Sequence, residues 1–396
     1  MLIGLVGRPS TGKSSFFKAA TLSDVAIANY PFTTIEANKG VGFVKVDCVD
    51  KEFNVQCNPR MGYCIEHNRF VPVELIDVAG LVPDAHLGKG KGNQFLDDLR
   101  QADALIHVVD ISGSTNAFGE AVEPGSHDPS KDIEFLEVEI DMWFYGIIEK
   151  GWERFARRIV LEGQKINEAL QKQLSGLNVR HSHIDIALKK LKLEDVVPTQ
   201  WTSQNLKELA TELRKMTKPI IISANKVDTA SGMRNFEKIR NNPDYIIVPS
   251  SAESEIALKQ AAKAGMISYI PGDSDFEIAQ KDKLNEKQLA ALEFIRSNVL
   301  KRYGSTGIQQ VLNDAVFKLL KYMAIFPGGI NNLTDSKGRV LPDCFLLPEN
   351  STALDFAYKL HTDFGKNFIR AIDVKTKRTV GKEHILHHRD VVEIIT

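Results

Sequence analysis

The stretch LIGLVGRPSTGKS, residues 2–14, decides the fold of this 396-residue chain. Its apolar start, Leu2–Val6, is typical of a buried strand, and residues 14–20 predict a helix. Between them, Gly7–Ser14 fits the pattern G-x-x-x-x-G-K-[ST], in which glycines let backbone N–H groups approach a polyphosphate closely. The following helix N-terminus favours negative charge. The sequence therefore predicts a phosphate-binding loop, in preference to a Gly-rich turn with an incidental lysine.

Each part of this loop has a predicted role. The mobile cation of Lys13 suits the β- and γ-phosphates, and the hydroxyl of Ser14 is a ligand for Mg²⁺. Downstream, the motif Asp77-Val78-Ala79-Gly80 ends an apolar run, so Asp77 can hold hydrated Mg²⁺ and the N–H of Gly80 can meet a γ-phosphate. The candidate phosphate-binding residues are Gly7, Arg8, Pro9, Ser10, Thr11, Gly12, Lys13, Ser14, Ser15 and Gly80.

A second motif, Asn225-Lys226-Val227-Asp228, follows another apolar run and predicts the base. A carboxylate at Asp228 accepts hydrogen bonds from the N1–H and the exocyclic amine of guanine, and adenine has no such pair of donors. Asn225 is expected to tie this loop to the phosphate loop, and the stem of Lys226 to cover the ring. Ser251-Ala252, after the next run, is placed to offer a backbone N–H to guanine O6.

The remaining pattern predicts an α/β fold. Near-continuous apolar runs ending at Val78, Asp110, Ser223 and Pro249 alternate with helix-like stretches, which favours a mostly parallel, doubly wound sheet of the P-loop NTPase type. Residues 116–215 contain no convincing strand and predict a helical insertion, interpreted as a structural lid or spacer. From Met323 short strand-like runs predict a small α+β domain. The expected domains are 1–115 with 216–322, the insertion 116–215, and 323–396.

Composition excludes several classes of protein. Lys+Arg number 50 against 51 Asp+Glu, and 43% of residues are hydrophobic, which excludes a wholly disordered chain and a globally basic nucleic-acid coat. No apolar run approaches the ~18 residues that span a membrane. The N-terminal residues show no basic leader, and four cysteines make no secreted disulfide framework, so we expect a cytoplasmic protein.

These residues resemble the Obg family of GTPases, close to its Obg-like ATPase (YchF) branch. The resemblance is carried by Gly7–Ser14, by Tyr30-Pro31-Phe32-Thr33-Thr34, by residues 77–82 and by Gly88-x-Gly90-x-Gly92-Asn93-x-Phe95-Leu96. The C-terminal segment is similar to a TGS domain, a small β-grasp module. A loop threonine can complete Mg²⁺ coordination, and the resemblance implies Thr34 rather than Thr33 for that switch role. The implied catalytic residues are Lys13, Thr34 and Gly80.

Departures from the family refine the prediction. Relatives that prefer ATP lack the Lys and Asp of N-K-x-D, which are present here, so we expect GTP. Potassium-activated relatives carry Asn where this chain has Ser10. Leu81 stands where many GTPases have a water-positioning Gln, so we expect turnover below ~1 s⁻¹ without a partner. His86 is the nearest polar candidate, although a solvated loop histidine is the simpler interpretation. Arg8 is interpreted as a surface residue rather than a catalytic arginine.

Two further clusters have open interpretations. Cys48, Cys57, Cys64 and His67 could hold Zn²⁺, but their spacings lack the C-x2-C pair, and a stapled hairpin, a disulfide or free thiols are favoured over the metal. Residues 366–389 are basic, and the TGS resemblance favours RNA contact through Lys375, Lys377 and Arg378 over a merely solvated sheet face.

The sequence as a whole predicts a Mg²⁺-dependent GTPase that acts as a regulatory switch on the ribosome or another RNA assembly. The alternatives are a nucleotide-gated scaffold for RNA or the ribosome with negligible hydrolysis, and an ATP-using P-loop enzyme. Neither the particular partner nor the oligomeric state follows from these residues.

Overall fold

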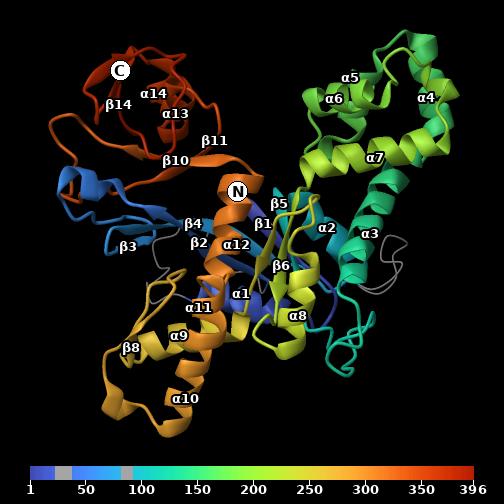
Figure 1. The fold of residues 1–396 in the computed structure, drawn as a ribbon. Helices are drawn as coiled ribbons and strands as arrows, with labels where there is room; N and C mark the ends of the chain where they lie inside the picture. The colour runs from blue at the N-terminus through green and yellow to red at the C-terminus, as the bar shows by residue number, and fades with distance from the viewer. Residues whose placement is uncertain (23–37, 82–91) are drawn as a thin grey trace. The chain divides into compact units, whose positions relative to one another are not determined.

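The computed structural model describes residues 1–22, 38–81 and 92–396, shown as a coloured ribbon in Figure 1. The chain divides into two compact units. The first contains residues 1–17 and 75–253, and the second contains residues 18–74 and 254–396. No helix within the described ranges is both long enough and apolar enough to cross a membrane.

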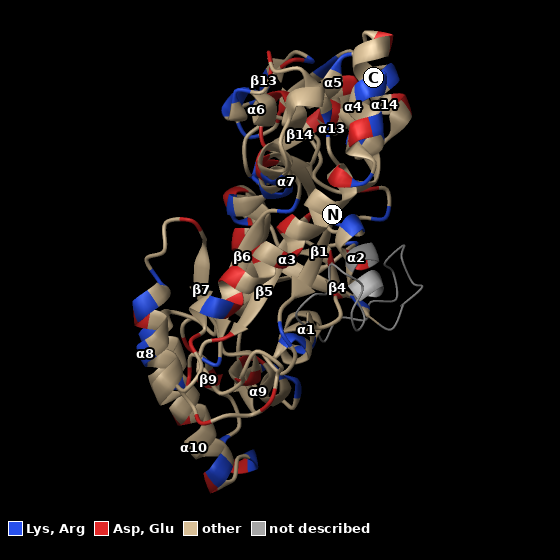
Figure 2. Cartoon of the chain, turned by 90° about the vertical axis from the view of Figure 1, so that its right-hand side faces the viewer, with Lys and Arg blue, Asp and Glu red and all other residues tan. Residues whose placement is uncertain are grey.

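The first unit is built on a parallel sheet. Its strands, in spatial order, are the end of β4 (Asn68–Asp77), β1 (Leu2–Val6), β5 (Ala104–Asp110), β6 (Ile220–Asn225) and β7 (Ile247–Pro249). The pairs β1–β5, β5–β6 and β6–β7 are all parallel. Figure 2 shows β5 almost entirely in the tan of uncharged residues, as its buried sequence ALIHVVD requires. The carboxyl ends of these strands meet at one edge, where ligands of such sheets bind.

The first unit also contains helices outside the predicted insertion. They are α1 (Lys13–Thr21, which passes into the second unit), α2 (Gly92–Gln101), α8 (Ala230–Ile239) and the start of α9 (Ala252–Lys263). The predicted insertion consists of α3 (Ser130–Glu149), α4 (Trp152–Glu162), α5 (Ile166–Gln173), η4 (Ser175–Leu177), α6 (His181–Leu191), η5 (Pro198–Gln200) and α7 (Ser203–Thr217), drawn in green in Figure 1.

Apolar packing joins the insertion to the sheet. One core cluster runs from Val6 and Ile76 on the strands to Trp152 and Trp201 in the insertion. The two tryptophan rings stack with centroids 5.2 Å apart. Arg214 of α7, only 3% exposed, pairs with Glu137 and Asp141 of α3. The insertion therefore shares its core with the nucleotide-binding sheet rather than forming a separate globule.

The second unit holds a hairpin region and the C-terminal domain. Beside the first part of β4 lie β2 (Lys39–Asp47), η2 (Val49–Phe53) and β3 (Tyr63–Ile65). Then follow β8 (Ile267–Ser268), β9 (Glu277–Ile278), η6 (Lys281–Lys283), α10 (Glu286–Ile295), η7 (Arg296–Leu300), α11 (Lys301–Tyr303), α12 (Ile308–Asn313) and η8 (Asp314–Leu319). Gly304 ends the α10–α11 helix at φ +81°, the left-handed conformation that glycine commonly adopts just past a helix.

The C-terminal domain is a five-stranded mixed sheet with two helices. Its strands lie in the order β11 (Phe345–Pro348), β10 (Tyr322–Pro327), β14 (Val391–Ile395), β12 (Arg370–Asp373), β13 (Arg378–Val380), and its helices are α13 (Ala353–Leu360) and α14 (Thr362–Lys366). Phe356 of α13 packs in one cluster with Ile325 and Val392. The predicted fold class, a mostly parallel nucleotide-binding sheet with a helical insertion and a small C-terminal α+β domain, is confirmed.

Candidate nucleotide-binding site

The phosphate loop has a backbone that only glycine fits at two positions. Gly7 has φ +148°, and a Cβ there would lie 2.4 Å from the carbonyl oxygen of Val108. Gly12 has φ +94°, and a Cβ there would lie 2.2 Å from Nδ2 of Asn225. Both distances are far inside van der Waals contact, so the pattern's two glycines are steric requirements of this loop.

Lys13 and Ser14 occupy the first turn of α1 at the end of the loop. The Lys13 side chain is 8% exposed, and its Nζ donates a hydrogen bond of 2.7 Å to the Arg8 carbonyl. Burial lowers the pKa of Lys13 from 10.5 to about 8, with Asp77 opposing that shift. A buried, poorly compensated ammonium is suited to accept the negative charge of a phosphate tail.

This pKa predicts a pH dependence of nucleotide affinity. A bound phosphate favours the ammonium and raises its pKa, so GDP should bind most tightly below pH 8 and take up a proton above it. Between pH 7 and pH 9 the affinity should fall about tenfold, measured by isothermal titration calorimetry. The Lys13→Arg variant is the control, because arginine stays charged over this pH range. Its GDP affinity should decline less than that of the unaltered protein, since only the titration of guanine itself remains. Equal declines in both proteins would contradict the assignment.

Ser14 and Asp77 form an oxygen-rich corner beside Lys13. The Ser14 hydroxyl donates to Oδ2 of Asp77 at 3.2 Å. Burial raises the pKa of Asp77 above its ordinary value, with Lys13 and Ser14 opposing it, and a cation there would favour the charged carboxylate. A hydroxyl and a carboxylate are hard oxygen donors of the kind Mg²⁺ uses, so these two residues fit the ion. The predicted third ligand, Thr34, lies outside the described residues.

Asn225 connects the phosphate loop to the two loops predicted for the base. Its buried side chain donates from Nδ2 to the Thr11 carbonyl at 3.0 Å and accepts at Oδ1 from the Ala252 N–H at 3.1 Å. Thr11 and Ala252 are thereby fixed to the end of β6. Of the two N–H groups of Ser251-Ala252 predicted to be candidates for guanine O6, that of Ala252 donates to Asn225 in this structure.

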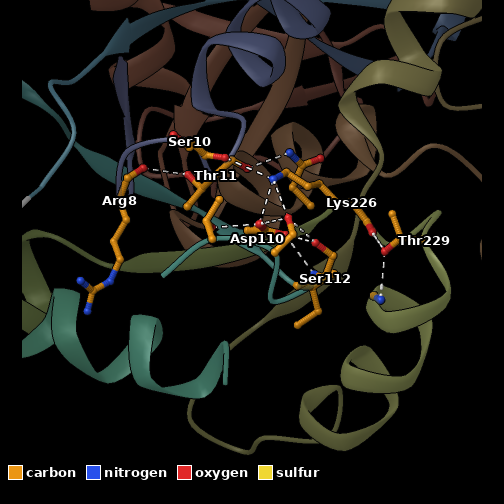
Figure 3. Close-up of polar contacts among 12 residues, drawn as sticks. Arg8, Ser10, Thr11, Asp110, Ser112, Lys226 and Thr229 are labelled. Carbon is orange, nitrogen blue, oxygen red and sulfur yellow. Dashed lines mark hydrogen bonds and ion pairs between the residues drawn. The ribbon is translucent and has the colours of Figure 1, made fainter. Parts of the chain in front are cut away.

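Lys226 and Asp228 continue the same loop. Nζ of Lys226 pairs with Oδ2 of Asp110 at 2.8 Å and donates to the Ser10 carbonyl at 3.2 Å, as Figure 3 shows. The Lys226 backbone turns at φ +65°, and Asp228 follows half-buried. Among the described residues, none hydrogen-bonds or ion-pairs with the Asp228 carboxylate. Its acceptor atoms therefore stay available to a base.

Asp110 lies in the candidate site, although the sequence alone does not place it there. It ends β5, is 1% exposed, and accepts hydrogen bonds from Ser114 and Thr115 as well as from Lys226. The apolar run ending in Asp was visible in the sequence, but its pairing with a residue 116 positions away was not. His107, three residues earlier on the same strand, is also buried, and burial together with the charges of Lys13 and Arg8 lowers its pKa to about 3.

The interpretation of Arg8 as a surface residue is wrong. Arg8 is 6% exposed, its Nε lies 2.6 Å from Oδ1 of Asp132, and its guanidinium lies 3.8 Å from the Phe135 ring centroid. It also donates to the Ala117 carbonyl. Figure 3 shows its side chain extending away from Ser10 and Thr11 toward α3. Local sequence contains no sign of this, because the partners belong to the insertion.

Arg8 and Asp132 therefore join the phosphate loop to α3, and His127 also pairs with Asp132 at 2.9 Å.

The Asp132→Ala variant should lose about 3 kcal/mol of unfolding free energy, because it leaves a buried guanidinium without its anion. Chemical denaturation monitored by circular dichroism measures this loss. The control, Arg157→Gln, breaks an exposed pair with Glu153 at 3.9 Å and should change stability by less than about 0.5 kcal/mol. A similar small change in both variants would contradict the anchoring role.

The other predicted catalytic positions have different outcomes. Thr33, Thr34 and His86 lie outside the described residues. Leu81 is 1% exposed and packs in the core cluster that contains Val6 and Phe95, so its side chain fills the core and offers nothing to a water molecule. Gly80 is close to the phosphate loop, since a Cβ on it would lie 3.3 Å from Nζ of Lys13.

The predicted RNA-contact residues lie close together in sequence, between β12 and the start of β13 in the C-terminal domain. Lys377 and Arg378 are exposed at the β12–β13 turn. Lys375 instead pairs with Glu52 at 2.7 Å, and Arg389 pairs with the same carboxylate. Part of the positive charge of residues 366–389 is therefore neutralised by Glu52.

Comparison with known proteins places this geometry in a family. A model described as 50S ribosome-binding GTPase matches residues 2–139. One described as Obg-like GTPase YGR210-like, G4 motif-containing domain, matches residues 223–328, and a TGS domain model matches residues 330–396. An uncharacterized GTP-binding protein of Methanocaldococcus jannaschii is 48% identical over 100% of this chain and 99% of its own length. A ribosome-binding ATPase YchF of Bacillus subtilis is 29% identical over 98% and 97%. This chain belongs to the YchF-like GTPase family.

Solved structures share this fold. A GTP-binding protein from Pyrococcus horikoshii OT3 superimposes with a TM-score of 0.78 at 40% identity, covering 100% of both chains. The YchF GTPase of Schizosaccharomyces pombe, at 20% identity and a TM-score of 0.59, shares the fold over 100% of this chain and 97% of that one. The resemblance predicted from the motifs, including the C-terminal TGS domain, is confirmed.

Proposed function

We propose that this YchF-like protein hydrolyses GTP in preference to ATP, with Mg²⁺ held by Ser14 and Asp77, and that it acts as a switch on the ribosome. The observation that carries the proposal is the bridge from Asn225 to Thr11 and Ala252. It fixes the base-recognition loop against the phosphate loop, so that Asp228 and Lys13 would hold the two ends of one nucleotide.

The chemistry follows from charge. In phosphoryl transfer, negative charge spreads over the γ-phosphate oxygens, and positioning plus electrostatic stabilisation supply most of the rate. Lys13 and the N–H groups of the loop supply that stabilisation, and a bound Mg²⁺ adds to it. The aliphatic side chain of Leu81 cannot orient the attacking water. We therefore expect slow GTP hydrolysis that a partner accelerates.

The partner proposal rests on the names of relatives and on the C-terminal domain. The YchF proteins similar to this chain are named as ribosome-binding, and the exposed Lys377 and Arg378 offer positive charge for RNA phosphates. The proposed place of action is the cytoplasm, where ribosomes translate.

Single-turnover hydrolysis with and without ribosomal subunits tests this proposal. The expected result is a rate below ~1 s⁻¹ for the isolated protein and a clear increase with subunits, accompanied by co-sedimentation that depends on GTP over GDP. A charge reversal at Lys377 and Arg378 should weaken co-sedimentation and reduce its dependence on salt. No stimulation and no co-sedimentation in either nucleotide state would contradict the switch.

A second candidate is a nucleotide-gated scaffold with negligible hydrolysis. The buried Leu81 side chain favours it, because nothing at that position orients the attacking water. Nucleotide-dependent co-sedimentation without any hydrolysis, even with ribosomes present, would support the scaffold over the GTPase switch.

A further inference from the structure

Three of the chain's cysteines gather in the second unit, in the region between β2 and β4. Cys48 directly follows β2, Cys57 lies in the loop after η2, and Cys64 is in the short strand β3. Cys48 and Cys57 are 1% and 5% exposed, and Cys64 is half-buried. With them lies Asp50, whose side chain is fully buried within η2. Three buried or half-buried thiols around a buried carboxylate have no role in nucleotide binding.

The distances among these groups are those of ligands around one ion. The three sulfur atoms and a carboxylate oxygen of Asp50 all lie within 4.8 Å of one another. Sγ of Cys48 is 3.6 Å from Sγ of Cys57, and Sγ of Cys64 is 3.9 Å from Oδ2 of Asp50. In a tetrahedron with Zn–S bonds of about 2.3 Å, neighbouring sulfur atoms lie about 3.8 Å apart. The four atoms are thus already spaced as the corners of a zinc site.

We propose that Cys48, Cys57, Cys64 and Asp50 bind one structural Zn²⁺ ion. Thiolate-rich tetrahedral sites with no open position are typical of structural zinc, and this set of donors suits Zn²⁺ better than Mg²⁺ or Ca²⁺. On binding, Zn²⁺ replaces the protons of the thiols, which pass to solvent, and no atom changes oxidation state.

The surroundings orient these ligands. The backbone N–H of Cys57 donates to Oδ2 of Asp50 at 3.0 Å, and Nδ1 of His67 lies 2.9 Å from Oδ1. His67 therefore contacts the carboxylate of Asp50 and is not itself a proposed ligand. This corrects the set of three cysteines and His67 that the sequence suggests, because Asp50 takes the place of His67. Such outer partners fix metal ligands in place.

The guanidinium of Arg69 places a positive charge next to the cysteine cluster. Arg69 is 1% exposed and lies opposite Cys64 in the β3–β4 strand pair. The Arg69 guanidinium also interacts electrostatically with the sulfur of Cys57. Arg69 would likewise offset the excess negative charge of three thiolates and a carboxylate around one divalent ion.

A disulfide accounts for the cluster less well than a metal does. Any disulfide would use two of the three mutually close sulfurs and leave the third with no function, whereas one metal ion uses all three. Cys344, the remaining cysteine, lies outside the group whose ligand atoms are within 4.8 Å of one another. It therefore serves as an internal control rather than as a proposed ligand.

The proposed ion would fix a loop that contacts the C-terminal segment within the same unit. The N–H groups of Asn58 and Arg60 donate to the carbonyls of Val340 and Pro342 at 2.9 and 2.8 Å. Arg69 donates to the carbonyls of Leu341 and Pro342, each at 2.9 Å. These partners lie just before β11, so the zinc would act as a staple where the hairpin meets the C-terminal domain.

Metal analysis of the full-length protein tests the proposal. Protein purified without chelator or affinity tag should contain about one zinc per chain by mass spectrometry of the metal. Exchange with Co²⁺ should give the thiolate-to-metal absorption of a tetrahedral site. After denaturation in chelator without reductant, all four thiols should react with a thiol reagent. Absence of zinc and of the cobalt spectrum, iron or copper in zinc's place, or only two reactive thiols, would overturn it.

Variants identify the ligands. Cys57→Ser and Cys64→Ser should each reduce bound zinc to below about 0.1 per chain, whereas Cys344→Ser and His67→Ala should retain about one. Asp50→Ala should weaken Co²⁺ affinity by at least about tenfold. The cobalt spectrum of the unaltered protein reports on the site even where a variant fails to fold. Loss of zinc in Cys344→Ser or His67→Ala equal to that in Cys57→Ser would overturn the proposed ligands.

Discussion

The Asp228→Ala variant should bind GTP about 10³-fold more weakly than the unaltered protein while its affinity for ATP changes less than about threefold. The carboxylate has no hydrogen bond or ion pair within the described part of the chain, so its loss removes only contacts to a ligand. Guanine would then bury its N1–H and exocyclic amine without an acceptor, which costs the full desolvation of both donors. Competition binding against a fluorescent GDP measures both affinities.

Two further variants make this prediction specific. Asp195→Ala removes an exposed carboxylate in the insertion and should leave both affinities unchanged. Asp228→Asn should favour xanthosine over guanosine nucleotides, because its amide donates to the 2-carbonyl of xanthine and its oxygen accepts from N1–H. Equal loss of GTP and ATP affinity in Asp228→Ala, or no gain for xanthosine in Asp228→Asn, would contradict direct contact with the base.

The second large effect concerns catalysis. Lys13→Met should slow single-turnover GTP hydrolysis by about 10²- to 10³-fold, because the cation that offsets developing charge on the γ-phosphate is lost. The free protein should not lose stability, since burial of the charge, expressed in the lowered Lys13 pKa, is unfavourable in the folded state. Quench-flow kinetics at saturating nucleotide separate this effect from weakened binding.

A matched lysine gives the control for this variant. Lys18→Met alters an exposed lysine near the end of α1 and should leave the hydrolysis rate within about twofold of the unaltered value. Thermal denaturation of both variants shows whether each remains folded. Similar rates for Lys13→Met and the unaltered protein would exclude Lys13 from the reaction.

The parts of the site that the sequence predicts are those whose chemistry is contiguous in the chain. Gly7 and Gly12 are predicted because a phosphate loop tolerates no side chain at either position, and the structure shows the clash each Cβ would meet. Strands β1 and β5 are predicted because burial on both faces requires continuous apolar runs. The bounds of strand β2 are not predicted, because two glycines and two lysines interrupt its apolar residues.

The parts that the sequence leaves open depend on residues far apart in the chain. From the sequence Arg8 is predicted to lie on the surface, because its partner Asp132 is far away in the chain. The contacts of Asp110 likewise depend on the pairing of β5 with β6. The cysteines lack a compact spacing, yet η2 and β3 gather them around Asp50. Tertiary contacts of this kind leave no periodic or local signal.

Direct calorimetric titration of the unaltered protein with GTP and with ATP, at equal Mg²⁺ and pH 7, tests the central claim that one pocket holds a triphosphate at Lys13 and reads guanine at Asp228. Binding of GTP at least about 100-fold more tightly than ATP is the expected result. Equal affinities, or tighter binding of ATP, would contradict it.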